Sequence, residues 1–431
     1  MSQNELISDL FRTEFRKIIA VLIKTFGIDQ IKTAEDIVSD TFLVATKTWQ
    51  TTGIPNNPKA WLYKVAKNKT LDVQKRNDIY RNKVVPDVLN SSKTDFSYEI
   101  DIDLSKKGIL DSQLKTIFAI CNKTIPENAQ IALALRILCG FGVEEIANAF
   151  LVSKDTINKR LFRAKEKLRA ADLDLKIPKD SELEERLNTV LKIIYLLFNE
   201  GYYSQCKKSS LRKDLCYEAV RLNYLLTNCE TTNKPSVNAL LSLMCFHTSR
   251  FEARMDQDGE FILYEDQDIA LWDTSLIEKG RYYLRKACTG DKVSKYHLEA
   301  AIGYWHTIRD KDKTQEKWDQ ILQLYNQLLQ IEYSTVAALN RTYALSKVKG
   351  KRTAIKEAEK LKLSNNHLYY SLLGDLYEGI DELEAKRNYK LALRLARIKA
   401  DKSLLSKKID NLMVSTPEKE ENLEKKGVKS F

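Results

Sequence analysis

The 431-residue sequence predicts an all-α protein built from several helical domains. Glycine and proline, which interrupt helices, number only 14 and 7. Apolar residues recur at helical spacing along most of the chain, and alternating strand patterns are few. A chain of this length holds two or three domains, so we expect two small helical domains followed by a larger domain of helical repeats.

The overall charge favours a polyanionic partner, because lysine and arginine outnumber aspartate and glutamate by 70 to 59 and the pI is about 9.0. The seven cysteines are scattered and never spaced as CxxC, which indicates reduced thiols rather than disulfides or a zinc site. The N-terminus lacks a signal-peptide pattern, and no stretch of about 18 apolar residues occurs. We therefore expect a cytoplasmic protein without a membrane span.

Residues 1–83 form the first expected domain. A loop with the sequence TTGIPNN precedes a helix that begins at Pro58, since proline suits the first turn of a helix. One side of this helix is rich in lysine, and aromatic residues accompany it. Cations with aromatic rings suit single-stranded or distorted nucleic acid, whereas the alternative interpretation places Trp49 and Trp61 in the core.

Residues 84–112 lose this periodicity and become polar and acidic. We expect a flexible linker that separates two basic helical domains. The carboxylates of this linker are Asp87, Asp95, Glu99, Asp101 and Asp103.

Residues 113–172 form the second expected domain, which contains a helix-turn-helix pattern. A short helix around Ala147 is followed by a tight turn and by a longer helix that Ser153 is placed to cap. Cations gather on the outer face of the second helix only, which favours DNA binding over the alternative of two surface helices with a solvated basic face. The narrow apolar stripe of the second helix consists of Ile157, Leu161, Ala164 and Leu168.

Residues 180–413 form the third expected domain, which is nearly neutral and rich in tyrosine, leucine and alanine at helical spacing. Residues 369–396 approach the tetratricopeptide pattern, and residues 336–361 look like a weaker copy. Stacked helix pairs of this kind leave a concave surface for a partner. The tail, residues 414–431, is too polar to pack, so we expect it to be disordered.

Three segments resemble bacterial sigma-70 family factors of the extracytoplasmic-function type. AEDIVSDTFLVATKTW (34–49) is similar to region 2.2, NPKAWLYKVAKNKTLDVQKR (57–76) to regions 2.3 and 2.4, and residues 128–169 to region 4. The remainder resembles the tetratricopeptide-containing C-terminal extension of one subgroup, through motifs such as YLLFNEGYY (195–203) and LYEDQDIALWD (263–273). The resemblance implies a subunit that binds core RNA polymerase, through its beta-prime and beta subunits, and promoter DNA.

The resemblance also implies three groups of contact residues. The polymerase would be met by Glu35, Asp36, Asp40, Phe42 and Val44. The −10 element would be read by the loop of residues 51–57 and the helix after it, through Asn56, Asn57, Lys64, Lys67, Asn68, Lys75 and Arg76. The −35 element would be read by Asp155, Asn158, Lys159 and Arg163 on bases and by Lys154, Thr156, Arg160 and Lys167 on phosphates.

Two features leave alternatives open. Phe162 points outward and either contacts a thymine methyl group or packs on the polymerase or on the C-terminal domain. The acidic linker either passes through a basic polymerase channel or serves as an ordinary soluble connection.

The sequence predicts no enzyme and no cofactor, because it contains no nucleophile elbow, Walker loop, HExxH or glycine-rich fingerprint. Glu265, Asp266 and Asp268 with His306 have the chemistry of metal ligands, but the tryptophan and tyrosine residues near them favour a packed core with paired carboxylates, and we expect no metal.

The main rival interpretation is a conventional helix-turn-helix regulator with an effector-binding repeat domain. A third is a repeat scaffold that binds RNA or a protein. The sequence leaves open the promoter, the inducing signal, the ligand of the C-terminal domain and whether that domain activates or inhibits.

Overall fold

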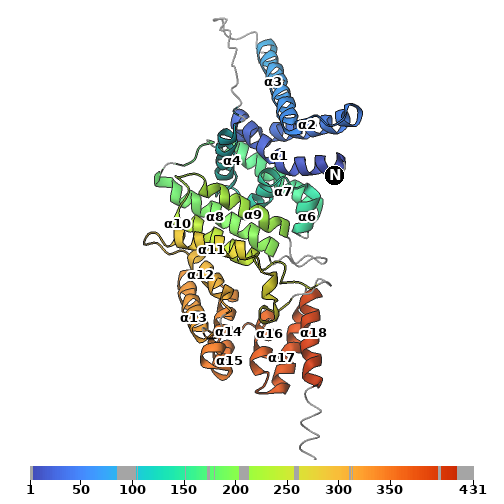
Figure 1. Ribbon diagram of the computed structural model, residues 1–431. Helices are drawn as coiled ribbons and strands as arrows, with labels where there is room; N and C mark the ends of the chain where they lie inside the picture. The colour runs from blue at the N-terminus through green and yellow to red at the C-terminus, as the bar shows by residue number, and fades with distance from the viewer. Residues whose placement is uncertain are drawn as a thin grey trace, which may run out of the picture. The chain divides into compact units, whose positions relative to one another are not determined.

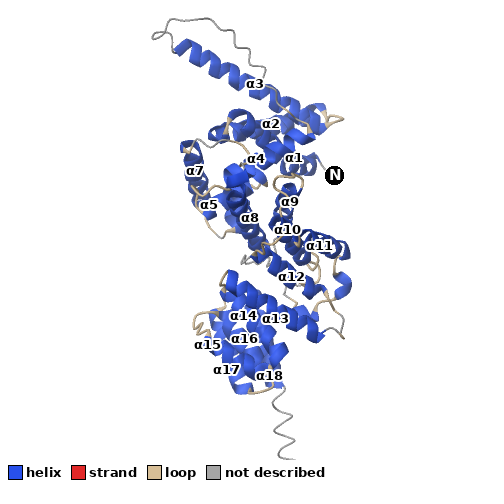
Figure 2. Cartoon of the chain, turned by 90° about the vertical axis from the view of Figure 1, so that its left-hand side faces the viewer, coloured by secondary structure: helices blue, strands red, loops and turns tan. Residues whose placement is uncertain are grey.

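The computed structural model describes residues 3–84, 103, 105–150, 152–171, 175–178, 180–202, 213–256, 262–309, 312, 314–396 and 399–414. Within these residues the regular secondary structure is helical and no strand occurs, which confirms the predicted fold class. The chain divides into two compact units, Met1–Leu197 and Phe198–Phe431. Figure 1 and Figure 2 show the helices of each unit.

Unit 1 begins with helix α1 (Gln3–Phe26), whose apolar side forms the centre of the first domain. Phe15, Ile18, Ile19 and Leu22 of this helix are all at most 1% exposed. A short 3-10 turn, η1 (Ile28–Gln30), leads into α2 (Ile31–Thr52), and α3 (Pro58–Val84) follows the loop. In both views α3 extends beyond α1 and α2 (Figure 1 and Figure 2).

A buried carboxylate on α1 fixes the start of α3. Glu14 is 1% exposed and accepts hydrogen bonds from Lys17 Nζ and from the Tyr63 hydroxyl, both at 2.9 Å, and Lys59 Nζ lies 3.4 Å away. Burial opposes ionisation of Glu14, but these donors and charges outweigh it and lower its pKa. Because Lys59 and Tyr63 belong to the first turns of α3, the charged form of Glu14 holds that helix against α1.

The second domain of unit 1 begins earlier than expected. Helix α4 starts at Lys106, where Ser105 Oγ accepts a hydrogen bond from Gly108 N at 3.0 Å, whereas the predicted linker ran to residue 112. The reason is tertiary: one side of α4, including Leu114, Ile117 and Phe118, is buried. Of the linker carboxylates, Asp103 is described and exposed, while those at 87, 95, 99 and 101 lie outside the described residues.

The remaining helices of this domain are α5 (Glu127–Leu133), the π-helical turn η2 (Ala134–Leu138), α6 (Val143–Ala149), α7 (Lys154–Ala170) and α8 (Asp180–Tyr202). The helix α8 begins where the third domain was expected. Its residues up to Leu197 nevertheless belong to unit 1. Arg186 of α8 donates to the Phe118 carbonyl at 2.7 Å, which joins α8 to the end of α4.

Unit 2 is organised around a helix that is buried on nearly all sides, α10 (Pro235–Thr248). Phe246 of α10 packs against two glycines on neighbouring helices, Gly280 and Gly303. A Cβ added at Gly280 would lie 2.5 Å from the Phe246 ring, so only glycine permits this approach. The other helical elements are α9 (Lys213–Thr227), η3 (Tyr264–Asp266), η4 (Ile269–Leu271), α11 (Thr274–Ala287), α12 (Lys295–Thr307), α13 (Thr314–Ile331), α14 (Thr335–Lys349), α15 (Lys351–Lys360), α16 (His367–Tyr377), α17 (Glu382–Leu395) and α18 (Lys399–Val414).

The segments with repeat-like sequence form helix pairs, α14 with α15 and α16 with α17. In Figure 1, α16, α17 and α18 lie side by side. Gly374 of α16 faces the fully buried ring of Tyr389 on α17, whose hydroxyl donates to Asp375 at 2.5 Å and to Glu378 at 3.0 Å. The pairing agrees with the expected helical hairpin, but the assignment to the tetratricopeptide class stays a prediction. The tail beyond Val414 lies outside the described residues.

We predict that Gly374→Ala destabilises unit 2 by about 2 kcal/mol, because the new methyl group would lie 2.4 Å from the Tyr389 ring and force the two helices apart. Urea unfolding followed by circular dichroism measures the effect. Ser371→Ala on the same helix is the control and should change stability by less than about 0.5 kcal/mol. An equal response of the two variants would contradict the close packing.

We also predict that unit 2 loses stability as the pH falls below about 6.5. Burial, with the nearby charges of Arg250, Lys317 and Arg309, holds the pKa of His306 well below its ordinary value of 6.5. Below pH 6.5 the unfolded chain therefore binds a proton at His306 that the folded chain refuses. This difference removes about 1.4 kcal/mol of stability per pH unit for one proton.

Chemical denaturation at pH 7.5, 6.5 and 5.5 measures this slope. The variant His306→Gln should show a shallower slope than the wild-type chain between pH 6.5 and 5.5, and identical slopes would refute the assignment. The variant should keep part of the dependence of stability on pH, because burial and nearby charges also lower the pKa of His247.

Candidate nucleic-acid interface

The helix-turn-helix has the local structure that the sequence predicts. Ser153 Oγ accepts a hydrogen bond from Thr156 N at 3.1 Å and caps α7. Ala147 is 3% exposed on α6, which packs beside α7. The predicted apolar stripe is buried at all four positions, Ile157, Leu161, Ala164 and Leu168. This burial fixes the rotation of α7 about its axis and therefore fixes which side chains face outward.

The expected base-reading side chains of α7, namely Asp155, Asn158, Lys159 and Arg163, are all exposed. The expected phosphate contacts differ in their surroundings. Lys154 Nζ pairs with Glu144 of α6 at 2.9 Å, and Arg160 stacks its guanidinium 5.6 Å from the centre of the Phe150 ring. The Thr156 hydroxyl lies 2.9 Å from Ser153 Oγ, and Lys167 is exposed. The outer face of α7 is thus a basic surface suited to DNA.

Phe162 is 66% exposed on this basic face. An aromatic ring with this exposure is compatible with either expected role, contact with a thymine methyl group or with a protein partner. Unit 1 itself does not cover it.

The second basic surface consists of the loop before α3 and the outer side of that helix. Asn57 uses its Oδ1 atom to accept a hydrogen bond from Ala60 N at 3.0 Å, so it caps α3 and keeps only its amide NH₂ for another contact. Asn56 is exposed beside it. The other expected −10 contacts, Lys64, Lys67, Asn68, Lys75 and Arg76, are exposed as well.

Trp49 belongs to the core rather than to a stacking surface. Its ring is 2% exposed and meets the Trp61 ring edge-on, with centroids 5.4 Å apart. Trp61 is half-buried, so the pair anchors the loop between α2 and α3. The core interpretation of Trp49 therefore fits the structure.

The expected polymerase-binding residues on α2 separate into two groups. Asp36 and Asp40 are exposed, and Asp40 pairs with Lys69 of α3 at 3.5 Å. Phe42 is 5% exposed and packs against Phe11, with ring centroids 5.0 Å apart, so it supports the helix from inside. Val44 is half-buried.

Sequence reasoning missed Leu43, which is 57% exposed. Leu43 follows Asp36 and Asp40 at the i, i+4, i+7 spacing of a single helix face, and this spacing was the signal that could have identified it. We call Asp36, Asp40 and Leu43 the α2 stripe. An exposed leucine beside carboxylates suits contact with another protein.

Glu35 is buried, in contrast to its neighbour Asp36. Its Oε1 atom accepts a hydrogen bond from Arg136 Nε at 2.9 Å, and its Oε2 atom contacts Lys165 Nζ. Only 6% of the residue is exposed. Arg136 lies on η2 and Lys165 on α7, so the carboxylate joins the first domain of unit 1 to the helix-turn-helix domain.

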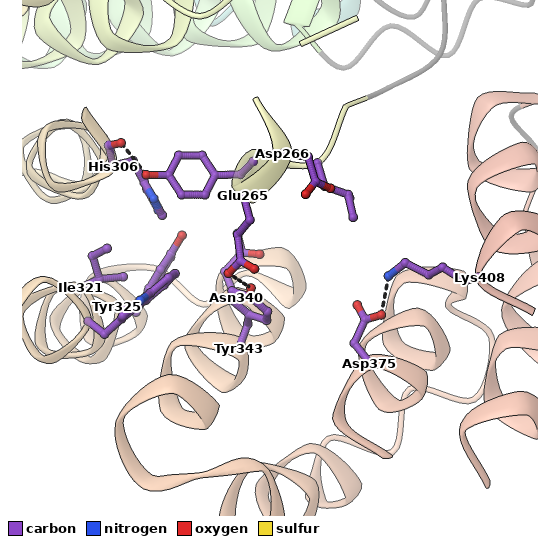
Figure 3. Close-up of a pocket in the computed structure, with 12 residues that line it drawn as sticks. Glu265, Asp266, His306, Ile321, Tyr325, Asn340, Tyr343, Asp375 and Lys408 are labelled. Atoms are coloured by element: carbon purple, nitrogen blue, oxygen red, sulfur yellow. Dashed lines mark hydrogen bonds and ion pairs between the residues drawn. The ribbon is translucent and has the colours of Figure 1, made fainter. Parts of the chain in front are cut away.

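Unit 2 contains a cavity of about 340 Å³. Figure 3 shows Glu265 of η3 pointing toward Tyr343, with Asp375 and Lys408 on the opposite side. Glu265 accepts hydrogen bonds from the Tyr343 hydroxyl at 2.9 Å and from Lys347 Nζ at 2.8 Å, and Lys408 pairs with Asp375. The walls carry the rings of Tyr264, Trp318, Tyr325 and Tyr343.

The surroundings of Tyr264, one of the residues that line the cavity, are strongly cationic. The Tyr264 hydroxyl donates to the His306 carbonyl at 2.6 Å and lies 2.8 Å from Lys317 Nζ, while the Arg309 guanidinium stacks 3.9 Å from the centre of the Tyr264 ring. Burial, with the neighbouring arginines, lowers the pKa of Lys317 to about 8. Among the described residues no group of acids, histidines and cysteines is arranged to hold a metal ion. In the same residues no helix is long and apolar enough to cross a bilayer.

Family models match three parts of the chain. Residues 10–78 match sigma-70 region 2 and residues 123–168 match sigma-70 region 4. Residues 186–288 match a family of unknown function, DUF6596. The two sigma matches contain the two basic surfaces described above.

Two relatives cover different shares of the chain. An uncharacterized protein from Rhizobium meliloti is 33% identical over 382 residues, which cover 88% of this chain and 90% of that protein. An ECF RNA polymerase sigma-E factor from Haemophilus influenzae is 27% identical over 139 residues, which cover 30% of this chain and 70% of that protein. No solved structure matches the chain. The chain therefore belongs to the family of the Rhizobium meliloti protein, and its sigma-70 regions 2 and 4, followed by a DUF6596 domain, indicate a sigma factor.

Proposed function

We propose that the chain binds core RNA polymerase, recognises the −10 and −35 elements of a promoter and initiates transcription, with its C-terminal unit modulating this activity. One observation carries the proposal. Two exposed basic surfaces, on α3 and on α7, lie in the parts of the chain that match sigma-70 regions 2 and 4. A protein that binds DNA through its helix-turn-helix alone would not need the basic surface on α3.

Reading of the −35 element falls to the N-terminal half of α7. Its outward side chains, Asn158, Lys159 and Arg163, have the donors and acceptors that base edges in the major groove require. The helix enters the groove as a rigid element, because its buried stripe and its cap fix its orientation in the domain.

Reading of the −10 element falls to the loop before α3 and to the exposed side of α3. Lysine and arginine side chains there neutralise phosphates. The polar edges of Asn56 and the free amide of Asn57 suit contact with an extruded base. Glu14 supports this surface, because it holds Lys59 and Tyr63 and thereby the first turns of α3.

Polymerase docking falls to α2. The exposed carboxylates Asp36 and Asp40 suit a basic partner surface, and charge complementarity raises the rate of encounter. Leu43 adds an apolar contact on the same face.

The rival function is a conventional helix-turn-helix regulator in which unit 2 binds an effector. It predicts tight binding to duplex operator DNA without polymerase. It gives no role to the basic surface of α3 or to the α2 stripe.

The deciding experiment is co-elution of the purified chain with core RNA polymerase, followed by transcription from a fragment that carries its own upstream region. We expect a stable complex and discrete transcript starts. The charge-reversed variant Asp40→Lys should co-elute at least about fivefold more weakly, since it places a cation on the α2 stripe. Failure of the full chain to co-elute, together with tight binding to duplex DNA alone, would favour the conventional regulator.

A second prediction concerns sequence discrimination by α7. Arg163→Ala should reduce the preference for the cognate −35 element by about 1–3 kcal/mol if the side chain reads a base. Fluorescence anisotropy of the chain–polymerase complex on cognate and mutated promoters measures the preference. Arg169→Ala is the control on the same helix, because Arg169 lies in the last turn and pairs with Glu166 at 2.9 Å. Equal weakening on all sequences would assign Arg163 to phosphate instead.

A further inference from the structure

We infer that Glu35, Arg136 and Lys165 form a lock that keeps the two promoter-binding domains together in the free chain and opens when polymerase docks. We call this cluster the Glu35 lock. The inference rests on the proposed function, because it concerns regulation of the polymerase-binding helix α2. In the free chain Glu35 pairs with Arg136 and Lys165, and these partners must leave before Glu35 can contact the polymerase.

The Glu35 lock is a buried carboxylate whose two oxygens are both paired with cations. Both oxygens of the carboxylate are engaged, one by Arg136 and one by Lys165, and the glutamate side chain is 8% exposed. Each cation has a side chain that is only 19% exposed. A buried carboxylate that keeps its charge requires such partners, so removal of either cation leaves an uncompensated charge.

Arg136 is itself held in place by the helix-turn-helix domain. Its Nη1 atom donates to the Phe141 carbonyl at 3.1 Å. Its guanidinium also lies 5.6 Å from the centre of the Phe15 ring on α1, which is a second contact with the first domain. Lys165 follows the buried Leu161 by four residues on α7, so it lies next to the seam that anchors this helix. Both cations are therefore presented by rigid parts of the second domain.

A second ion pair joins the same two domains. Lys24 Nζ of α1 lies 3.0 Å from Asp111 of α4, and α4 packs along α1. Both side chains are about one-third exposed, at 37% and 33%, so this pair is accessible to reagents. It reports on the closed arrangement without involving Glu35.

The closed arrangement cannot read both promoter elements at once. The −10 and −35 elements lie roughly 25 base pairs apart, or about 85 Å along DNA. A compact unit of the size of Met1–Leu197 has a radius of gyration of only about 16 Å. Promoter recognition as proposed therefore requires α7 to move away from α2, which breaks the Glu35 lock and the packing of α7 beside η1.

The exposed α2 stripe explains how the polymerase gains access to the lock. Asp36 and Asp40 remain exposed while Glu35 is engaged, so a basic partner surface can first bind the stripe. Cations of that surface then stand next to Glu35 and can replace Arg136 and Lys165. The polymerase shifts the equilibrium because it binds the open state better than the closed state.

The test uses the full chain with Lys165→Glu, which places a second carboxylate beside Glu35. The first readout is zero-length carbodiimide coupling of Lys24 to Asp111, quantified by mass spectrometry. The second is the affinity for core RNA polymerase without DNA. We expect the Lys24–Asp111 cross-link to fall severalfold and the polymerase affinity to rise roughly tenfold, because the closed state no longer competes. In the wild-type chain the cross-link should also disappear on addition of polymerase.

Lys123→Glu is the matched control. It introduces the same charge change in the same domain, but Lys123 pairs with Glu185 on the surface of unit 1 and both side chains are more than two-thirds exposed. Equal cross-linking and equal polymerase affinity in the two variants would overturn the lock. A purely structural role of the cluster would instead lower both stability and polymerase affinity in Lys165→Glu.

Two further outcomes keep the inference separate from the proposed function. If Lys165→Glu does not fold, as judged by circular dichroism, Lys165→Gln replaces it, because this variant removes the cation without adding a repelling charge. We expect its cross-link yield to fall and its polymerase affinity to rise, each by roughly threefold relative to the wild-type chain. If the wild-type chain does not bind polymerase, the proposed function fails. The cross-link in Lys165→Gln against Lys123→Gln then still decides whether Glu35 holds the domains together.

Discussion

The buried charge of Glu35 is the constraint on which the arrangement of unit 1 depends. A carboxylate that is 6% exposed is accommodated in a folded protein only where cations and hydrogen-bond donors replace the water it has lost. Here both donors come from the other domain, so the polar contact and the apolar packing of α4 on α1 support the same closed arrangement. Glu14 has the same role inside the first domain, where its partners position α3.

Local features of the candidate interface were predictable because the residues that create them are close in sequence. The cap of α7 by Ser153 and the four buried positions of its stripe follow from helical spacing within one segment. The same holds for Pro58 at the start of α3. The pairing of Glu35 was not predictable in this way, because Arg136 and Lys165 lie 101 and 130 residues away along the chain. The start of α4 was missed for a similar reason, since its helix depends on burial against α1.

The division of α2 into two faces shows which sequence signal went unused. Phe42 falls on the side of Val38 and Ala45, both fully buried, whereas Leu43 falls on the side of Asp36 and Asp40. A leucine on the same helix face as exposed carboxylates can contact a protein partner. A phenylalanine on the same face as the buried residues cannot. The charge and hydrophobicity of α2 therefore indicated that it contacts a partner. Only the helical periodicity separates the residues exposed for that contact from the residues that pack in the core.

Glu265, which has the chemistry of a metal ligand, makes packing contacts at the cavity of unit 2. Glu265 is held by Tyr343 and Lys347, and Asp375 by Lys408 and Tyr389. Each of these acids already has the hydrogen bonds and the countercharge that a cation would supply, so a metal ion would have to displace lysines rather than fill a void. The segment that carries Tyr264 and Glu265 is thereby anchored to α12, α13 and α14. These contacts within unit 2 account for the tyrosine and the glutamate at positions 264 and 265 of its motif.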